Sequence, residues 1–159
     1  MSFPLILIHL KCETLVPDGV ESQKLVAWQV VVVTGGAMGL GRMLSIWFAQ
    51  LGAVVLGWDV DASNGQKVVR EIASVATVAG GEAHSFQVDV GDRSPVYEAG
   101  RKVLEQFQAE DILVNNAGVV CGRTLLATSD AANTFAHFWT VCAFLPEMVR
   151  RNRGHKTAS

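Results

Sequence analysis

Cysteine, proline and tyrosine are scarce in this sequence, and neither sign of charge dominates it. The three cysteines, Cys12, Cys121 and Cys142, are odd in number and widely spaced. They fit neither a disulfide framework nor a zinc site, and they favour free thiols in a reducing compartment. The net charge of -2 gives no indication of a nucleic-acid partner. With 159 residues, half of them apolar, the chain has the length of one domain and ample material for a core.

No apolar run is long enough to cross a bilayer, which takes about 20 residues. The longest candidate, Phe3 to Leu10, is broken by Pro4 and His9. A signal peptide is not indicated either, because no basic residues precede the run and no small-residue cleavage site follows it. Two interpretations of residues 1–26 remain, a short anchor lying at a membrane surface and a loosely docked arm.

Strand-like and helix-like periods alternate along the rest of the chain. Continuous apolar runs at residues 30–33 and 112–114 predict strands buried on both faces. Residues 53–58 and 84–90 are also expected to be strands. Between and after them, apolar residues recur at helical spacing. The last of these faces is formed by Phe138, Val141, Cys142, Leu145 and Val149. A β-α repeat of this kind predicts a doubly wound α/β fold, a parallel sheet with helices on both faces.

Local signals predict where three of the helices begin, end or bend. Gly52 is suited to the left-handed position after the first helix. Ser94 and Pro95 predict the start of the third helix, as a capping hydroxyl followed by proline in the first turn. Pro146, inside the last helix, predicts a kink or a local break.

The strongest functional motif is the glycine-rich segment 34–41, Thr-Gly-Gly-Ala-Met-Gly-Leu-Gly, which connects the first strand to the first helix. Glycines allow a tight turn and let a pyrophosphate approach the backbone without a Cβ in the way. The following helix would direct unpaired N–H groups at that phosphate. The alternative is an ordinary glycine-rich turn, but the placement between strand and helix favours a dinucleotide site.

Two aspartates follow later strands of the predicted sheet. Asp59 ends the second strand about 20 residues past the glycines, where a carboxylate accepts hydrogen bonds from ribose hydroxyls and repels a 2′-phosphate. This predicts NAD in preference to NADP; the alternative for Asp59 is helix capping, a role that Asp61 or Ser63 could already fill. Asp89 ends the third strand and could bond an adenine amino group, or it could cap a loop, with Asp92 as competitor.

The segment Asn115-Asn116-Ala117-Gly118 follows the fourth strand, Ile112 to Val114. Together with Thr-Gly-x-x-x-Gly-x-Gly, this motif resembles the short-chain dehydrogenases/reductases over roughly Val26 to His155. The resemblance implies a Rossmann-like sheet with strand order 3-2-1-4, incomplete because the later strands are missing. It also implies that Asn115 steadies the sheet near the cofactor's ribose. The residues expected to bind the cofactor are Thr34, Gly35, Gly39, Leu40, Gly41, Asp59, Asp89, Val90, Asn115, Ala117 and Gly118.

Segments 119–122, 136–140 and 143–146 resemble the membrane-associated retinol and hydroxysteroid dehydrogenase branch. The resemblance implies oxidoreduction of lipophilic alcohols and carbonyls with NAD(P) and a homo-oligomer among the partners, with no nucleic acid. It implies an intracellular location, either cytoplasmic or at an endoplasmic reticulum or lipid-droplet membrane. Asn133 matches the asparagine of the catalytic Asn-Ser-Tyr-Lys set, where it holds a water in a proton relay. No metal site is expected.

The sequence departs from the family pattern after Gly118, where it has no tyrosine. Tyr97, followed by Arg101, lies before the asparagine motif and is expected to pack on a helix surface. Ser129 is expected to be a helix cap, and the chain is expected to end about one strand before the catalytic serine. The segment between Asp130 and Asn133 is also about two helical turns short.

We therefore expect an arm over residues 1–26 and a partial NAD(P)-binding domain over 27–159 that lacks turnover by itself. The alternatives are a non-catalytic dinucleotide-binding fragment and a pairing partner of a full-length subunit. By the resemblance, Gly154 to Ser159 lies where the fifth strand begins. With that strand missing or reduced to a stub, residues 112–114 would form an open apolar edge, which predicts a chain that is aggregation-prone, dimeric or partly molten.

Overall fold

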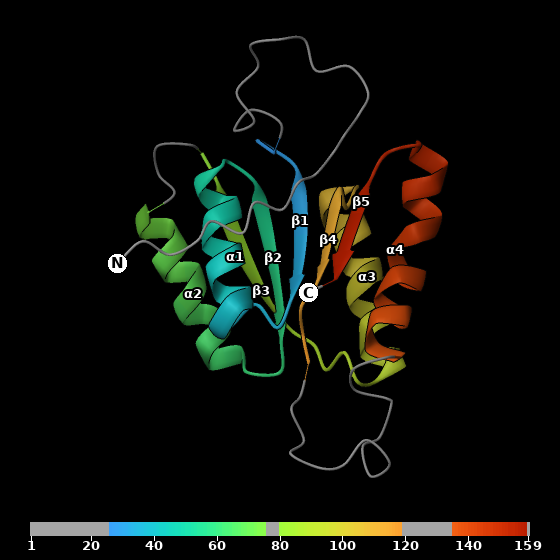
Figure 1. Ribbon diagram of the computed structural model, residues 1–159, viewed down its shortest axis with the longest axis horizontal. Helices are drawn as coiled ribbons and strands as arrows, with labels where there is room; N and C mark the ends of the chain where they lie inside the picture. Colours follow the sequence, from blue (N-terminus) through green and yellow to red (C-terminus); the bar gives the residue numbers. More distant parts are fainter. Residues whose placement is uncertain (1–25, 76–79, 119–134, 159) are drawn as a thin grey trace.

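The computed structural model describes residues 26–75, 80–118 and 135–158. Strands and helices alternate along the chain, and the strands form one sheet (Figure 1). The elements are β1 (Val30–Thr34), α1 (Gly39–Gln50), β2 (Val54–Asp59), α2 (Ala62–Val75), β3 (Glu82–Gln87), α3 (Arg93–Phe107), β4 (Ile112–Asn115), α4 (Ala136–Arg151) and β5 (His155–Ala158).

The five strands are parallel and lie in the order β3-β2-β1-β4-β5. The doubly wound sheet and the order 3-2-1-4 predicted from the sequence are confirmed. The chain winds outward from β1 in one direction to β3 and in the other to β4 and β5, so the direction changes between β1 and β4. In such sheets this switch point forms a crevice at the carboxyl ends of the strands, where ligands bind.

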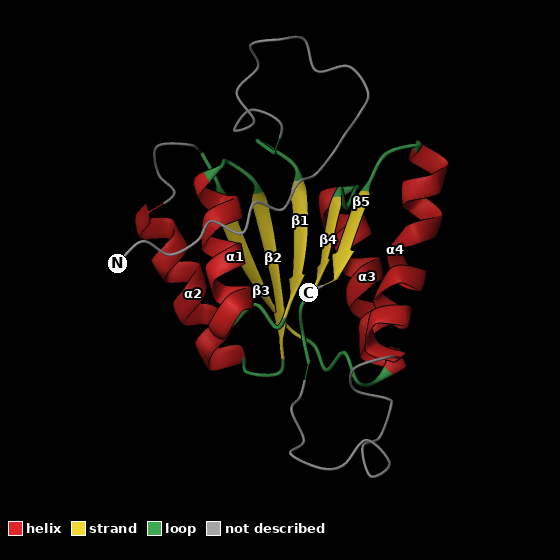
Figure 2. Cartoon of the chain, in the orientation of Figure 1, coloured by secondary structure: helices red, strands yellow, loops and turns green. Residues whose placement is uncertain are grey.

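Helices cover both faces of the sheet, with α1 and α2 on one side and α3 and α4 on the other (Figure 2). The side chains of β1 explain this arrangement, because alternate residues enter different cores. Val31 and Val33 pack with Phe48 of α1 and Ile72 of α2, whereas Val32 packs with residues of α3 and α4. A strand buried on both faces has no polar side to alternate with, which is why its sequence is a continuous apolar run.

β5 corrects the expectation that β4 forms the open edge of the sheet. All four residues of β5 pair with β4, from His155 beside Ile112 to Ala158 beside Asn115. The backbone of β4 is therefore bonded on both sides, by β1 and by β5. Among the described residues, β5 is the outermost strand on this side of the sheet. It carries an exposed lysine, Lys156, and lysine is a residue that discourages edge-to-edge pairing.

The packing of α4 also differs from the expectation. Its buried residues are Ala136, Thr140, Phe144 and Met148, spaced four apart. The apolar face predicted from the sequence is divided: Phe138, Leu145 and Val149 are 62%, 42% and 69% exposed, whereas Val141 is partly buried against the core. The buried stripe contains a small and a polar residue, so hydrophobicity alone located the buried side of α4 only in part. α4 also continues through Pro146 without a break.

The helix termini agree with the sequence in one case and not in another. Gly52 follows α1 with φ of 87° and occupies the predicted left-handed position. The predicted start of α3, with Ser94 as its cap, is wrong by two residues. Asp92 is the N-cap, and its side chain accepts a hydrogen bond from the Ser94 N–H at 3.0 Å. Pro95 consequently lies in the first turn, where its missing N–H costs no helical hydrogen bond.

Asp111, which directly precedes β4, connects that strand to β1, β5 and α4 at the amino ends of the strands. Its carboxylate accepts hydrogen bonds from the Val30 N–H at 3.1 Å and from Arg151 of α4 at 3.0 Å. Its backbone pairs with Val30 of β1 and with His155 of β5. The adjacent Glu110 is also buried, but neither of its carboxylate oxygens has a partner among the described residues. Burial and the like charge of Asp111 raise the pKa of Glu110 to about 8, against the opposing effect of Arg151.

Candidate functional site

The glycine-rich segment lies at the carboxyl end of β1, beside the switch point of the sheet. Gly35 and Gly39 adopt φ of 67° and 53°, in the left-handed region that favours glycine. Gly41 is restricted by space instead, because a Cβ there would lie 2.0 Å from the Gly35 carbonyl oxygen. A Cβ at Gly39 would meet nothing within 4 Å. The glycines therefore fold the loop back on itself and leave the side at Gly39 open to a ligand.

The first turn of α1 is suited to an anion. Its N-cap, Met38, makes no side-chain hydrogen bond to the helix, and the turn contains no acidic residue. Met38 and Leu40 are 56% and 53% exposed, so this end of α1 is accessible. Uncapped N–H groups and the helix dipole together favour a phosphate at such a position.

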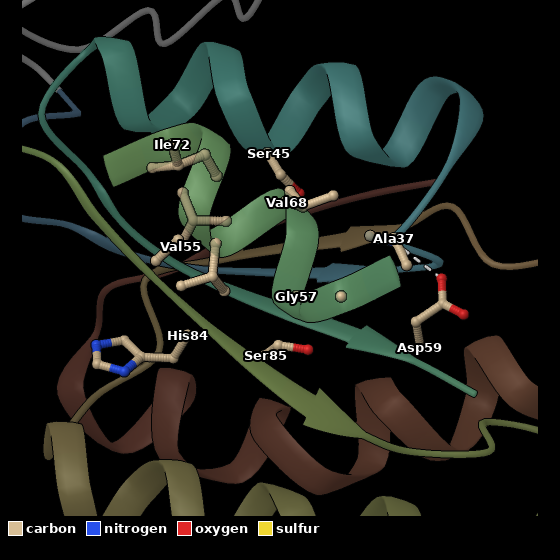
Figure 3. A pocket seen from close by; sticks show the side chains of 13 residues that line it. Ala37, Ser45, Val55, Gly57, Asp59, Val68, Ile72, His84 and Ser85 are labelled. Carbon is tan, nitrogen blue, oxygen red and sulfur yellow. Dashed lines mark hydrogen bonds between the residues drawn. The ribbon is translucent and has the colours of Figure 1, made fainter. Parts of the chain in front are cut away.

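Asp59 is the last residue of β2, as predicted, and it lies beside the loop (Figure 3). One of its carboxylate oxygens accepts a hydrogen bond from the Ala37 N–H at 3.0 Å, and the other accepts one from the Asp61 N–H at 3.0 Å. Asp61 itself caps α2 by accepting from the Asn64 N–H at 2.9 Å. The capping role that was the alternative for Asp59 therefore belongs to Asp61, and Asp59 connects the loop to β2.

A gap between α1, α2 and strands β2 and β3 extends inward from Asp59 and Ala37 (Figure 3). Most of the side chains around it belong to the buried interface between helices and sheet. Ser45 lies on its wall with a buried hydroxyl that has no hydrogen-bond partner among the described residues. Because its lining comes mainly from this helix–sheet interface, we interpret the gap as a packing space behind the site.

The asparagine motif forms the other wall of the loop. The Thr34 hydroxyl accepts hydrogen bonds from the backbone N–H groups of Asn116 and Ala117, both at 3.0 Å. The Asn116 amide donates to the Thr34 carbonyl at 3.0 Å. Asn115 instead points into the protein, where it is 2% exposed and accepts a hydrogen bond from the Thr140 hydroxyl at 2.7 Å. The structure thus joins Thr34, at the start of the glycine-rich segment, to Asn116 and Ala117 of the asparagine motif.

Asn116, His137 and Thr140 were not among the residues selected from the sequence. Asn116 could have been found, because it belongs to the motif and its side chain contacts the loop directly. His137 and Thr140 carry no local signal; they reach the motif only because α4 packs against the end of β4. The His137 Nε2 atom lies 3.2 Å from the Ala117 carbonyl oxygen.

Asp89 and Val90 lie two and three residues past the end of β3. Asp89 is exposed and accepts a hydrogen bond from the Gly91 N–H at 2.8 Å, so it stabilises its own loop. Val90 is partly buried against the core beside α3. The loop-capping alternative thus describes the contact that Asp89 makes, and its exposed carboxylate remains a candidate for the adenine contact.

The candidates for catalytic residues are either outside the described residues or away from the loop. Asn133 and Ser129 lie outside the described residues. Tyr97 is on α3, 38% exposed, with the Arg93 guanidinium 5.2 Å from its ring centre. Arg101, the apparent partner of Tyr97, forms an ion pair with Glu105 at 2.6 Å. Tyr97 therefore has the helix-surface position expected from its place in the sequence.

The comparison with protein families agrees with this geometry. Residues 29–155 match the family described as short chain dehydrogenase. The chain belongs to this family. The match includes both walls of the site, the glycine-rich loop and the asparagine motif.

The curated relatives of this family member include steroid and retinol dehydrogenases. The chain is 39% identical to estradiol 17-beta-dehydrogenase 11 of Mus musculus over 94% of its own length and 52% of the relative's. It is 37% identical to epidermal retinol dehydrogenase 2 of Mus musculus, covering 85% of this chain and 45% of the relative. The chain thus spans about half the length of these relatives, and its resemblance to the retinol and hydroxysteroid branch is confirmed.

Solved structures share the fold and contain the expected kind of cofactor. A metagenomic short-chain oxidoreductase in complex with NADP matches with a TM-score of 0.76 and 33% identity, over 84% of this chain and 62% of that one. A 7α-hydroxysteroid dehydrogenase complexed with NADH and 7-oxo glycochenodeoxycholic acid matches with a TM-score of 0.76 and 25% identity, over 87% and 56%. Within the described part of the chain, none of the helices has the length and apolarity to span a membrane.

Proposed function

We propose that this chain is the dinucleotide-binding part of an NAD-preferring oxidoreductase that interconverts alcohols and carbonyl compounds. The observation that carries the proposal is the loop at the switch point, where glycine geometry leaves an open surface beside an uncapped helix terminus. A simple turn would not need glycine at position 39 to leave space for a side chain, because no described atom lies within 4 Å of a Cβ built there. The open space is instead suited to a ligand.

The residues present fit the cofactor in three regions. Gly35, Gly39 and Gly41 would hold the pyrophosphate against the first turn of α1. Asp59 would accept hydrogen bonds from the adenosine ribose, and the segment from Asn115 to Gly118 would line the nicotinamide side. In the bound state the dinucleotide supplies or accepts a hydride; the residues of this chain bind and orient it.

The preference for NAD rests on the charge of Asp59. Each carboxylate oxygen accepts one backbone hydrogen bond, which leaves lone pairs for the two ribose hydroxyls. A 2′-phosphate at the same position would bring like charges together in a partly buried site. The solved neighbours contain both NADP and NADH, so the preference is an inference from Asp59 alone.

The substrate class follows from the named activities of the relatives. Estradiol and retinol are lipophilic alcohols, and we propose that the complete protein acts on a steroid-like or retinoid-like substrate. Such substrates partition into membranes, so an intracellular membrane surface is the proposed location. The apolar side chains exposed on α4, Phe138, Leu145 and Val149, support a homo-oligomer, because apolar residues exposed on one helix can form part of an interface.

Calorimetric titration with NAD and NADP tests the cofactor proposal. We expect NAD to bind at least about tenfold more tightly, as the loss of one charge-assisted hydrogen bond costs roughly 1.5 to 3 kcal/mol. Asp59→Ala combined with Val60→Arg should reverse the order, since Val60 is adjacent and 59% exposed. Asp59→Asn keeps one acceptor oxygen for the loop and should reduce the preference without unfolding. Glu105→Gln, an exposed acidic control, should change neither affinity; equal affinity of the unmodified protein for both cofactors would contradict the assignment.

A further inference from the structure

The first turn of α4 contacts the back of the asparagine motif. The His137 Nε2 atom lies 3.2 Å from the Ala117 carbonyl oxygen. A carbonyl oxygen only accepts hydrogen bonds, so Nε2 carries the hydrogen in this contact. The two residues are 20 positions apart in the chain. The bond therefore forms only when α4 packs against the carboxyl end of β4.

Ala117 in turn forms part of the wall against which the glycine-rich loop packs. Its N–H donates to the Thr34 hydroxyl at 3.0 Å. A Cβ at Gly35 would lie 3.0 Å from the Ala117 Cα atom, and a Cβ at Gly41 would lie 2.6 Å from the Asn116 side-chain nitrogen. With so little free space, a displacement of residues 116–117 would move the loop itself.

Thr140, one turn further along α4, makes a second attachment. Its hydroxyl is fully buried and lies 2.7 Å from the Asn115 side-chain oxygen, closer than to the carbonyl oxygens of Ala136 and His137. Because Thr140 lies in the core, replacing it would alter stability and site geometry together. His137 is only partly buried, so its contribution can be separated from that of the core.

We propose that His137 is a positioning residue of the dinucleotide site, acting through the Ala117 carbonyl to hold the loop wall. The proposal rests on the proposed function, since the affinity that His137 supports is affinity for the dinucleotide. The chain of contacts runs from His137 to Ala117, from Ala117 to Thr34, and from Thr34 into the glycine-rich loop. Loss of the His137–Ala117 hydrogen bond would leave the residues of the glycine-rich loop unchanged, but residues 116–117, against which the loop packs, could then move.

Two substitutions separate the hydrogen bond from the bulk of the side chain. His137→Gln keeps a donor near the position of Nε2, whereas His137→Met keeps an apolar side chain of similar size without a donor. His155→Met is the matched control, because His155 is exposed and begins β5 at the opposite end of the sheet. The measurements are NADH affinity by fluorescence titration, thermal unfolding, and amide hydrogen exchange of Asn116 and Ala117 in the protein without ligand.

We expect His137→Met to weaken NADH binding about 2- to 10-fold, the effect of losing one net hydrogen bond, and to speed exchange of the two amides. His137→Gln should restore both, and His155→Met should change neither. Equal NADH affinity and equal exchange in His137→Met and the unmodified protein would overturn the proposal, as would the same loss in His137→Gln. Absence of NADH binding by the unmodified protein would refute the proposed function instead, and the exchange rates would then decide whether His137 holds the wall.

Discussion

Glu110 should make the protein less stable as the pH rises. Its carboxyl is 2% exposed and has no partner among the described residues, and its pKa is raised from 4.5 to about 8, chiefly by burial. The folded state therefore keeps the proton at a pH where the unfolded chain has released it. The stability that this proton provides is complete below the unfolded pKa and is lost progressively until the pH reaches the folded pKa.

The size of the effect follows from the two pKa values. Between pH 4.5 and 8 the free energy of unfolding should fall by about 1.4 kcal/mol per pH unit. At pH 7 the accumulated loss is about 3 kcal/mol, and above pH 8 it approaches about 4 to 5 kcal/mol. Asp111 and Arg151 are the charged groups that act on Glu110, and their opposing effects are already included in its pKa.

Glu110→Gln removes the titration but keeps a neutral side chain of the same shape. Urea unfolding of both proteins should give equal stabilities near pH 4.5 and a variant more stable by about 3 kcal/mol at pH 7. Glu105→Gln, an exposed control on α3, should stay within about 0.5 kcal/mol of the unmodified protein at both pH values. A stability difference that does not vary with pH, or a less stable Glu110→Gln at pH 7, would refute the reasoning.

Three further outcomes follow from the structure. Gly39→Val should abolish dinucleotide binding in a folded protein, because it combines a left-handed φ of 53° with the open ligand side of the loop; unchanged NAD titration would show that the loop is only a turn. Trp28→Gly should raise stability by about 1 kcal/mol in urea unfolding, because Trp28 has φ of 67° and is 74% exposed; a lower midpoint would mean that packing of the Trp28 ring beside Gly80, where an added Cβ would lie 3.4 Å from the ring, dominates. Phe138→Ser with Val149→Ser should shift any oligomer towards monomer in light scattering, since both side chains are exposed on α4; an unchanged mass would place the interface elsewhere.

Local sequence patterns determined the parts of the fold that depend on period and turn chemistry. The run Val30 to Val33 specifies a strand buried on both faces, because no polar residue interrupts it. Gly35 and Gly39 favour left-handed turns, and Asp59 ends its strand at the position suited to a ribose contact. The β-α alternation was sufficient to predict the parallel sheet, and the family resemblance that the motifs carry implied its 3-2-1-4 core and the edge at which the candidate site lies.

Tertiary structure decided which surfaces and polar groups meet. α4 has two plausible faces; the buried one contains Phe144 and Met148, which pack in the core, and Thr140, whose hydroxyl is bonded to Asn115 of β4. His137 reaches Ala117 across 20 residues, and Asp111 reaches Val30 across 81. Such contacts leave no periodic trace, since a polar side chain is stabilised in the interior only by a partner that folding brings to it. The raised pKa of Glu110 has the same origin, because it depends on burial that its position in the sequence does not reveal.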